Sequence, residues 1–257
     1  MHILVTNDDG VTAPGLLALA QALRALGKVT ILAPDRNWSA SGHVKTMHRP
    51  LRVREIMLED GLPALTADGA PSDCVALAVL GVVPEKIDLV VSGINPNANL
   101  GHDVTYSGTV TAAMEAVILG IPGLAVSLDS PENHLGMLDY APAAKIACQL
   151  AAKVIASGLP KGILLNINVP YLPEEEINGW QLTRQGLRVY QDALDVRQDP
   201  RGRPYYWIGG DVPTGVPDRG TDFGALAEGF VSITPLHLDL TAHQMLEELN
   251  NLLRAPA

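Results

Sequence analysis

The chain has 257 residues, of which 47% are hydrophobic, so it can bury the core of one large domain without needing a second. Its net charge of −10 argues against a surface that coats DNA or RNA, because such surfaces depend on many Lys and Arg contacts to phosphates. A single small phosphate held by a metal ion remains compatible with this charge. The start of the chain lacks a basic leader, and the longest apolar stretch, residues 74–83, is too short to cross a bilayer. We therefore expect a soluble, cytoplasmic protein without membrane contacts.

Five short apolar runs predict buried parallel strands, at residues 2–6, 28–34, 87–92, 123–128 and 162–168. Helical patterns separate these runs. The first begins near Pro14 and stops at Gly27, and the others are expected at residues 71–80, 107–119, 140–157 and 241–253. Residues 50–68 favour a hairpin. The alternation predicts an α/β fold in which helices cover both faces of a Rossmann-like, mostly parallel sheet, giving three layers.

The pattern changes near residue 180. Seven of the eleven aromatic residues lie between positions 180 and 230, among glycines, prolines and alternating apolar positions that are typical of β-ribbons. We expect one domain over residues 1–257, with a core over 1–180 and an extension over 181–257 that carries a β arm and a C-terminal helix. Because interface cores favour Tyr, Trp and Phe, the arm is predicted to pack on a partner subunit. The alternative is a hairpin folded back on its own domain.

Two adjacent aspartates, Asp8 and Asp9, follow the first predicted strand. On a continuing strand their side chains would point to opposite faces, but Gly10 and Pro14 predict that the strand has ended. The two carboxylates can then converge on a small divalent cation such as Mg²⁺ or Mn²⁺, at the sheet edge where α/β proteins bind ligands. Taken alone, the segment is also a common turn or helix-entry sequence.

Two further polar segments follow predicted strands. Residues 33–43 form a loop in which Ser39 could reach a metal or phosphate, or merely cap a turn. Residues 92–110 enter a helix at Ser107-Gly108-Thr109, where free N–H groups and the helix dipole favour an anion and Gly108 leaves room for it. The alternative is ordinary capping of that helix. Asn95, at the same sheet edge, could complete a metal shell through its amide oxygen.

Spacing argues against other common chemistries. The chain lacks a Gly-x-Gly-x-x-Gly after its first strand, a Gly-x-x-x-x-Gly-Lys-[Ser/Thr] loop and a Gly-x-Ser-x-Gly elbow. It also lacks His-x-x-x-His and paired cysteines, which disfavours zinc. His43 and His102 lie in the site loops as candidate proton donors or phosphate contacts, and Arg36 and Lys45 could also reach a phosphate. Cys74 and Cys148 are expected to be free thiols.

Several segments together carry a resemblance. They are Ile-Leu-Val-Thr-Asn-Asp-Asp-Gly at residues 3–10, Ala-Pro-Asp-Arg-Asn-x-Ser-x-Ser-Gly at 33–42, Ser-Gly-Ile-Asn…Ser-Gly-Thr-Val at 92–110, Asn-Ile-Asn-Val-Pro at 166–170 and the stretch 221–236. In this order, along nearly the whole chain, they resemble the SurE family of survival-protein nucleotidases. The resemblance implies a phosphatase that acts on nucleoside 5′- and 3′-monophosphates, with polyphosphate as a further substrate in some members.

The resemblance also implies one Mg²⁺ or Mn²⁺ per subunit and a homodimer or homotetramer that exchanges C-terminal elements. The metal ligands carry over onto Asp8, Asp9, Ser39 and Asn95. The phosphate contacts carry over onto Asn99, Ser107, Gly108 and Thr109. Asp8 or Asp9 would also orient or deprotonate the attacking water.

Two other hypotheses stay open at this point. A phosphatase of the haloacid-dehalogenase type uses an aspartyl nucleophile in an Asp-x-Asp motif, but position 10 of this chain is Gly10. A nucleotide-binding regulator that has lost catalysis would be expected to lack a ligand, and none of the eight carried-over residues is missing. Slow turnover beside tight nucleotide binding would favour the regulator.

Overall fold

A nine-stranded sheet forms the centre of the protein in the computed structural model, which describes residues 1–131 and 134–254. The strand order is β3-β4-β2-β1-β5-β6-β7-β11-β8. The five predicted strands are β1 (His2–Thr6), β2 (Lys28–Pro34), β5 (Leu89–Asn95), β6 (Gly123–Asp129) and β7 (Ile163–Pro170). Neighbours among these five pair in parallel, which confirms the predicted α/β sheet.

The ends of two strands differ from the prediction in a way that matters for the site. Strand β5 begins at Leu89 and continues past the apolar run to Asn95, because Asn95 still pairs with Ser127 of β6 beyond an irregularity in the register. Strand β7 continues in the same way to Pro170. Asn95 is therefore fixed by the sheet itself and not by a free loop.

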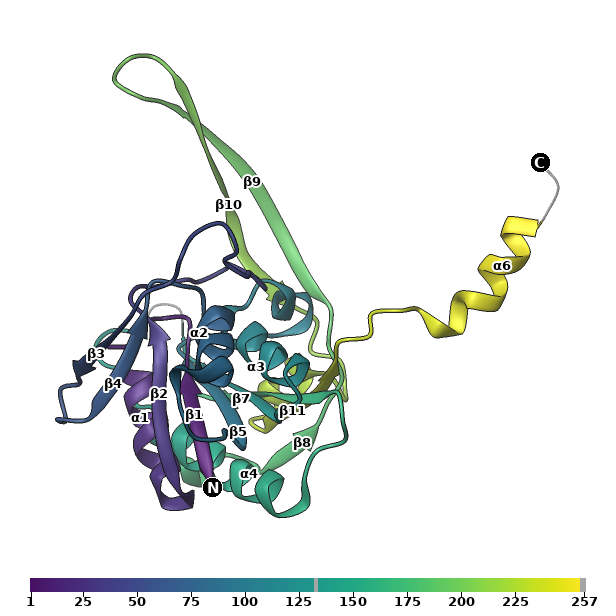
Figure 1. The fold of residues 1–257 in the computed structure, drawn as a ribbon. Coiled ribbons are helices and arrows are strands. Elements are labelled where there is room, and N and C mark those ends of the chain that lie inside the picture. The colour runs from purple at the N-terminus through teal and green to yellow at the C-terminus, as the bar shows by residue number, and fades with distance from the viewer. Residues whose placement is uncertain (132–133, 255–257) are drawn as a thin grey trace.

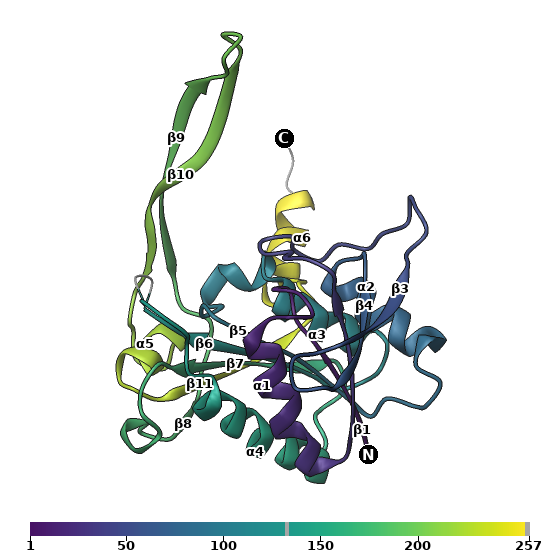
Figure 2. The same cartoon turned by 90° about the vertical axis from the view of Figure 1, so that its left-hand side faces the viewer.

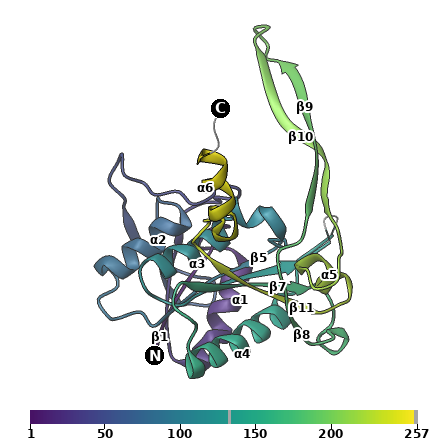
Figure 3. The same cartoon turned by 90° about the vertical axis from the view of Figure 1, so that its right-hand side faces the viewer.

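Helices cover both faces of the sheet, as predicted. Their bounds are α1 (Pro14–Leu23), α2 (Pro71–Leu77), α3 (Gly108–Ile118) and α4 (Ala141–Ser157), and helical turns at Arg24–Leu26 and Ala78–Val82 extend α1 and α2. Helices α1 and α4 lie on one side and α2 and α3 on the other (Figure 3). Strand alternation explains the two cores: Ile3 packs with the α1 and α4 side, whereas Leu4 packs with the α2 and α3 side.

The hairpin predicted at residues 50–68 is formed by β3 (Val53–Met57) and β4 (Pro63–Ala67), which pair antiparallel. Strand β4 in turn pairs in parallel with β2, so the hairpin extends the main sheet on one side.

Residues beyond 180 contribute to the central sheet as well as to an arm. Strand β11 (Val231–His237) pairs antiparallel with β7, and β8 (Trp180–Leu182) pairs with β11. The short helix α5 (Asp222–Ala227) precedes β11. The boundary expected at residue 180 therefore does not coincide with the edge of the sheet. Strand β11 was not predicted because polar residues occupy alternating positions along it, so it contains no continuous apolar run.

The predicted β arm is a two-stranded hairpin of β9 (Arg188–Gln198) and β10 (Pro204–Gly215) that projects from the body (Figures 1 and 2). It does not fold back on its own domain. The C-terminal segment also leaves the body, through a turn at His243–Met245 and helix α6 (Leu246–Arg254) (Figure 1). None of the helices in the described part of the chain is long and apolar enough to span a membrane.

Candidate active site

The site lies at the C-terminal ends of β1 and β5, two neighbouring strands of the sheet. After β1 the chain proceeds to β2 on one side, while β5 flanks β1 on the other side. Such a reversal of strand order opens a crevice at the C-terminal edge of a parallel sheet, where α/β proteins bind ligands. Asp8 and Asp9 follow β1 and Asn95 ends β5, so the sheet brings these three residues to one edge, as predicted.

A tight turn ends β1 and presents the two aspartates. The buried Asn7 side chain receives a hydrogen bond from the Gly10 N–H (3.2 Å) and donates one to the Gly10 carbonyl (3.0 Å). Gly10 has φ of +107°, and a Cβ at this position would lie 3.3 Å from the Arg36 backbone carbonyl carbon. This backbone conformation is readily available only to glycine.

Asp8 is buried at the N-terminus of α3. Its Oδ1 accepts a hydrogen bond from the Thr109 hydroxyl (2.5 Å). A Cβ on Gly108 would lie 2.6 Å from the Asp8 Cβ, so the absence of a side chain at Gly108 allows α3 to approach this closely. Burial raises the pKa of Asp8, and hydrogen bonds from the Thr109 hydroxyl and from backbone groups of Gly108 and Thr109 partly oppose that rise.

Asp9 sits beside Asp8 in a partly buried position. Burial is the main cause that raises the pKa of Asp9 to about 7, and repulsion from the Asp8 charge adds to it. None of the ion pairs between described residues involves Asp8 or Asp9. The protein therefore holds two neighbouring carboxylates whose charges its own described side chains do not neutralise, and a bound cation would neutralise them.

The loop that carries Ser39 is bound to the turn after β1 and to α3. The Trp38 N–H donates to the Asp8 carbonyl (2.7 Å), which places Ser39 next to the aspartates. Further along the loop, His43 Nε2 lies 3.0 Å and Lys45 Nζ 2.8 Å from the two carboxylate oxygens of Glu115, a buried residue of α3. Hydrogen bonding by His43 and Lys45 lowers the pKa of Glu115 against the effect of its burial. These two side chains therefore hold the loop on α3.

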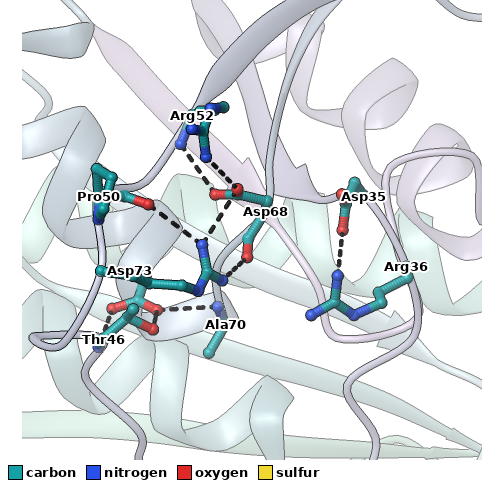
Figure 4. Close-up of polar contacts among 9 residues, drawn as sticks. Asp35, Arg36, Thr46, Pro50, Arg52, Asp68, Ala70 and Asp73 are labelled. Atoms are coloured by element: carbon teal, nitrogen blue, oxygen red, sulfur yellow. Dashed lines mark hydrogen bonds and ion pairs between the residues drawn. The ribbon is translucent and has the colours of Figure 1, made fainter.

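Residues of this loop and of the segment that follows it also contact three aspartates, Asp35, Asp68 and Asp73 (Figure 4). Asp73 accepts hydrogen bonds from the Thr46 N–H (2.8 Å) and the Thr46 hydroxyl (2.6 Å), and Asp68 pairs with Arg52 at 3.8 Å. Arg36, a candidate phosphate contact, lies 3.4 Å from Asp35. Like Lys45, Arg36 therefore already has an acidic partner within the protein.

Asn99 is held in place by two fully buried asparagines of β7. Asn168 accepts from the Asn99 N–H (2.8 Å), and the amide groups of Asn166 and Asn168 donate to the Asn99 carbonyl (2.8 and 3.2 Å). The Asn99 amide donates to the Ser127 hydroxyl (2.8 Å). Two polar residues at alternating positions of a buried strand were the signal for this network in the sequence.

A pocket of about 340 Å³ collects these groups. Among its lining residues are six of the eight predicted site residues: Asp8, Asp9, Ser39, Asn95, Asn99 and Ser107. The other two, Gly108 and Thr109, lie next to Asp8 at the start of α3. Ser107 also caps α3, because its hydroxyl accepts from the Val110 N–H (3.1 Å). Ser107 therefore caps α3, which is the alternative that the sequence left open, and it also lines the pocket.

The model of the family "Survival protein SurE" matches residues 3–192. The chain belongs to the SurE family. It is 55% identical over 250 residues to the 5′-nucleotidase SurE of Herpetosiphon aurantiacus, covering 97% of both chains. It is 53% identical over 249 residues to the 5′-nucleotidase SurE of Chloroflexus aggregans, covering 97% of this chain and 98% of the relative.

A solved structure extends the comparison to the fold. The crystal structure of the SurE protein from Aquifex aeolicus matches with a TM-score of 0.82 and 41% sequence identity, over 98% of this chain and 99% of that one. The SurE fold thus accounts for nearly the whole chain, including the arm and the C-terminal strands.

The donor set of this SurE chain fits a hard divalent cation. Two carboxylates, a hydroxyl and an amide oxygen are the oxygen ligands that Mg²⁺ and Mn²⁺ favour. The Asn95 amide nitrogen donates to the Asn97 carbonyl, which leaves the Asn95 amide oxygen as the atom available for a cation. In the described parts of the chain, no group of three or more His, Cys, Asp or Glu side chains could hold a metal. A cation at this site would therefore depend on Ser39 and Asn95 as well as on the aspartates.

The pocket also contains residues that were not predicted as site residues from the sequence, among them Asp103, Tyr106 and Arg188. Arg188 comes from the base of the arm, and its Nε lies 2.8 Å from Asp103 Oδ2. No spacing rule connects residues this far apart in the sequence. The pocket does not include the predicted His43, which pairs with Glu115, or His102, which is exposed.

Replacing Asn168 by Ala is expected to lower the free energy of unfolding by about 1–3 kcal/mol, because it leaves the buried Asn99 N–H without its acceptor. Urea unfolding measures this change. Asn178→Ala is the matched control: this exposed asparagine makes one hydrogen bond, to the Glu228 carbonyl, and its loss should cost less than about 0.5 kcal/mol. Equal effects of the two substitutions would contradict the role given to the Asn99 network.

Proposed function

We propose that this SurE chain is a divalent-metal-dependent phosphatase that hydrolyses nucleoside 5′-monophosphates, and also 3′-monophosphates, to nucleoside and phosphate. Curated relatives that match almost end to end are named 5′-nucleotidases, which supports the nucleotidase activity. The observation that carries the metal dependence is the pair Asp8 and Asp9, whose charges no described side chain neutralises, in one pocket with Ser39 and Asn95. Short polyphosphate is included in the proposal as a further substrate.

In this proposal Asp8, Asp9, Ser39 and Asn95 hold one Mg²⁺ or Mn²⁺. A cation bound there supplies Lewis-acid stabilisation of the phosphate and lowers the pKa of a bound water. The N-terminus of α3 at Ser107-Gly108-Thr109 contributes the positive end of a helix dipole, and Asn99 contributes an amide at the wall of the pocket. Asp9, which is more exposed than Asp8, is the residue proposed to orient the attacking water. Phosphoryl transfer mainly requires such positioning and charge stabilisation.

Removing divalent cations is expected to abolish hydrolysis of AMP, and adding back Mn²⁺ or Mg²⁺ to the dialysed protein is expected to restore it. Release of inorganic phosphate measures both steps, with residual metal determined by mass spectrometry. Full activity in protein with far less than one divalent ion per chain would rule out the proposal. Tight AMP binding with negligible turnover at saturating metal would instead support a regulator.

The aspartyl-nucleophile alternative is disfavoured by the turn after β1. That chemistry needs a second aspartate at position 10, where the backbone has φ of +107° and an added Cβ would press on the Arg36 backbone. Only glycine adopts this conformation without strain.

The proposed location is the cytoplasm. Cys74 and Cys148 are both free thiols in the structure, which is compatible with a reducing compartment.

We also propose that the protein is a homodimer or homotetramer. The hairpin carries exposed apolar side chains, including Trp207 (62% exposed) and Ile208 (85%), and α6 carries Leu252 and Leu253 (68% and 84%). Elements that leave the body with uncovered apolar surface typically pack on another chain.

The double substitution Trp207→Ser, Ile208→Ser is expected to reduce the number of subunits. Light scattering after gel filtration should give a wild-type mass of two or four times 27.3 kDa and a smaller mass for the variant. Met47→Ser, at another exposed apolar residue away from the arm, is the control and should leave the mass unchanged. A wild-type protein of 27.3 kDa would overturn this part of the proposal.

A further inference from the structure

A second cavity, of about 300 Å³, adjoins the candidate active site. Its walls include Leu100, Asp129, Pro217, Phe223 and Leu226, and Arg188 lines both this cavity and the pocket of the aspartates. The two spaces therefore meet at a single side chain. One holds the oxygen donors suited to a metal and a phosphate, and the other combines apolar side chains with Arg188 and the Asp129 carboxylate.

Arg188 is held firmly at this junction. Its Nε lies 2.8 Å from Asp103 Oδ2, while Asp103 Oδ1 accepts a hydrogen bond from the Tyr190 hydroxyl (2.5 Å). The guanidinium carbon lies 5.7 Å from the centre of the Phe223 ring, and only 19% of the Arg188 side chain is exposed. A planar cation fixed in this way loses little entropy when a ligand packs against it.

The apolar wall of the second cavity is also held in place by specific contacts. Leu100, Phe223 and Leu226 pack as one cluster. The buried Asp222 orients this wall, because its carboxylate accepts hydrogen bonds from the N–H groups of Phe223 (2.9 Å) and Gly101 (2.8 Å). A Cβ on Gly215 would lie 2.0 Å from the Phe223 ring, so only glycine lets β10 cross this ring.

The charges of the second cavity suit an uncharged ligand better than an anionic one. Arg188 is already paired with Asp103, and Asp129 adds a carboxylate to the wall. A second phosphate placed here would meet the Asp129 carboxylate. A nucleoside would find a guanidinium plane and apolar side chains for its base, and a carboxylate that can accept hydrogen bonds from hydroxyl or amino groups.

We propose that the nucleoside part of the substrate binds in this second cavity, and that Arg188 is the residue that determines the preference for nucleoside phosphates over other phosphate compounds. The proposal rests on the nucleotidase function proposed above. It assigns the two ends of one substrate to two neighbouring cavities: the phosphate end lies with the aspartates, and the base and sugar lie between Arg188, Phe223 and Asp129.

Binding of adenosine and of inorganic phosphate to the Mn²⁺-loaded protein tests the proposal, measured by calorimetry. Arg188→Ala is expected to weaken adenosine binding roughly ten-fold, the scale of one base-stacking contact, and to change phosphate binding by less than about two-fold. Asp129→Asn, which leaves the Arg188–Asp103 pair in place, is expected to weaken adenosine in the same selective way. Arg197→Ala is the matched control, because this arginine lies on the same strand, is exposed and pairs with Asp195.

Three results would overturn the proposal. The first is an equal loss of adenosine and phosphate binding in Arg188→Ala, which would mean a general disturbance of the site. The second is no change in either, which would place the nucleoside elsewhere. The third is a selective loss of tripolyphosphate binding, which would assign the cavity to a phosphate chain. Failure of the nucleotidase proposal itself would appear separately, as wild-type protein that binds these ligands without hydrolysing AMP.

Discussion

Asp8→Asn and Asp9→Asn are each expected to lower kcat/KM for AMP by at least about 10²–10³-fold, the scale seen when one essential group that stabilises transition-state charge is removed. An asparagine keeps the size of the side chain but removes its negative charge and replaces one of the two oxygens with a nitrogen. Both changes weaken a site built from only two carboxylates, a hydroxyl and an amide. Phosphate release at saturating Mn²⁺ measures the effect.

The same substitutions separate a functional role from a structural one. Burial and the neighbouring Asp8 raise the pKa of Asp9 from 3.8 to about 7, so ionisation of Asp9 destabilises the folded state increasingly as the pH rises from 3.8 to about 7, and fully above that. Metal-free Asp9→Asn protein should therefore melt at the same temperature as the wild type or higher, although it is inactive. Glu59→Gln, at an exposed carboxylate that does not line the pocket, should change neither property. Full activity of either site variant would remove Asp8 and Asp9 from the mechanism.

Gly108→Ala is expected to reduce activity on AMP by about 10²-fold. Alanine is a better helix former than glycine, so the substitution should favour α3 when considered by itself. At this position, however, the new methyl carbon would lie 2.6 Å from the Asp8 Cβ and 3.0 Å from Asp8 Oδ2. Either Asp8 or the first turn of α3 must move, and catalytic groups displaced by about 1 Å lose roughly this factor in rate. Steady-state kinetics at saturating Mn²⁺ measures the loss.

Gly209→Ala is the control for this experiment. Gly209 lies on β10, has nothing within 4 Å of an added Cβ, and should tolerate the methyl group with unchanged kinetics. If Gly108→Ala kept the wild-type kcat/KM, the close packing of α3 on Asp8 would have no part in catalysis.

Local patterns in the sequence were sufficient to predict the central strands and the ends of the helices beside them. β1 and β2 occupy the predicted ranges because β1 is buried throughout and β2 is buried from Ile31 onward. Gly27 and Gly158 end helical segments as their positions indicated. β11 was missed because it alternates polar and apolar residues and contains Pro235. Pro235 lies beyond Val231–Ile233, the residues that pair with β8, so its missing N–H interrupts no ladder on that side.

Some residues of the candidate site could likewise be predicted from local patterns, and others could not. Asp8, Asp9 and Asn95 were predictable because strand ends share an edge, and Gly108 because a helix begins there. The pairing of Arg188 with Asp103 depends on how the base of the arm packs over the turn before α3, and no local pattern encodes that packing. For the same reason the sequence left His43 as a candidate proton donor or phosphate contact, whereas the folded chain pairs it with Glu115.

The central claim is that one divalent cation lies between Asp8, Asp9, Ser39 and Asn95. Anomalous X-ray scattering from crystals of the protein grown with Mn²⁺ tests it most directly. The account predicts one anomalous peak per chain, with oxygens of these four residues as its protein ligands. A peak held by other residues, or no peak in crystals of protein that is active in the same Mn²⁺ solution, would contradict it.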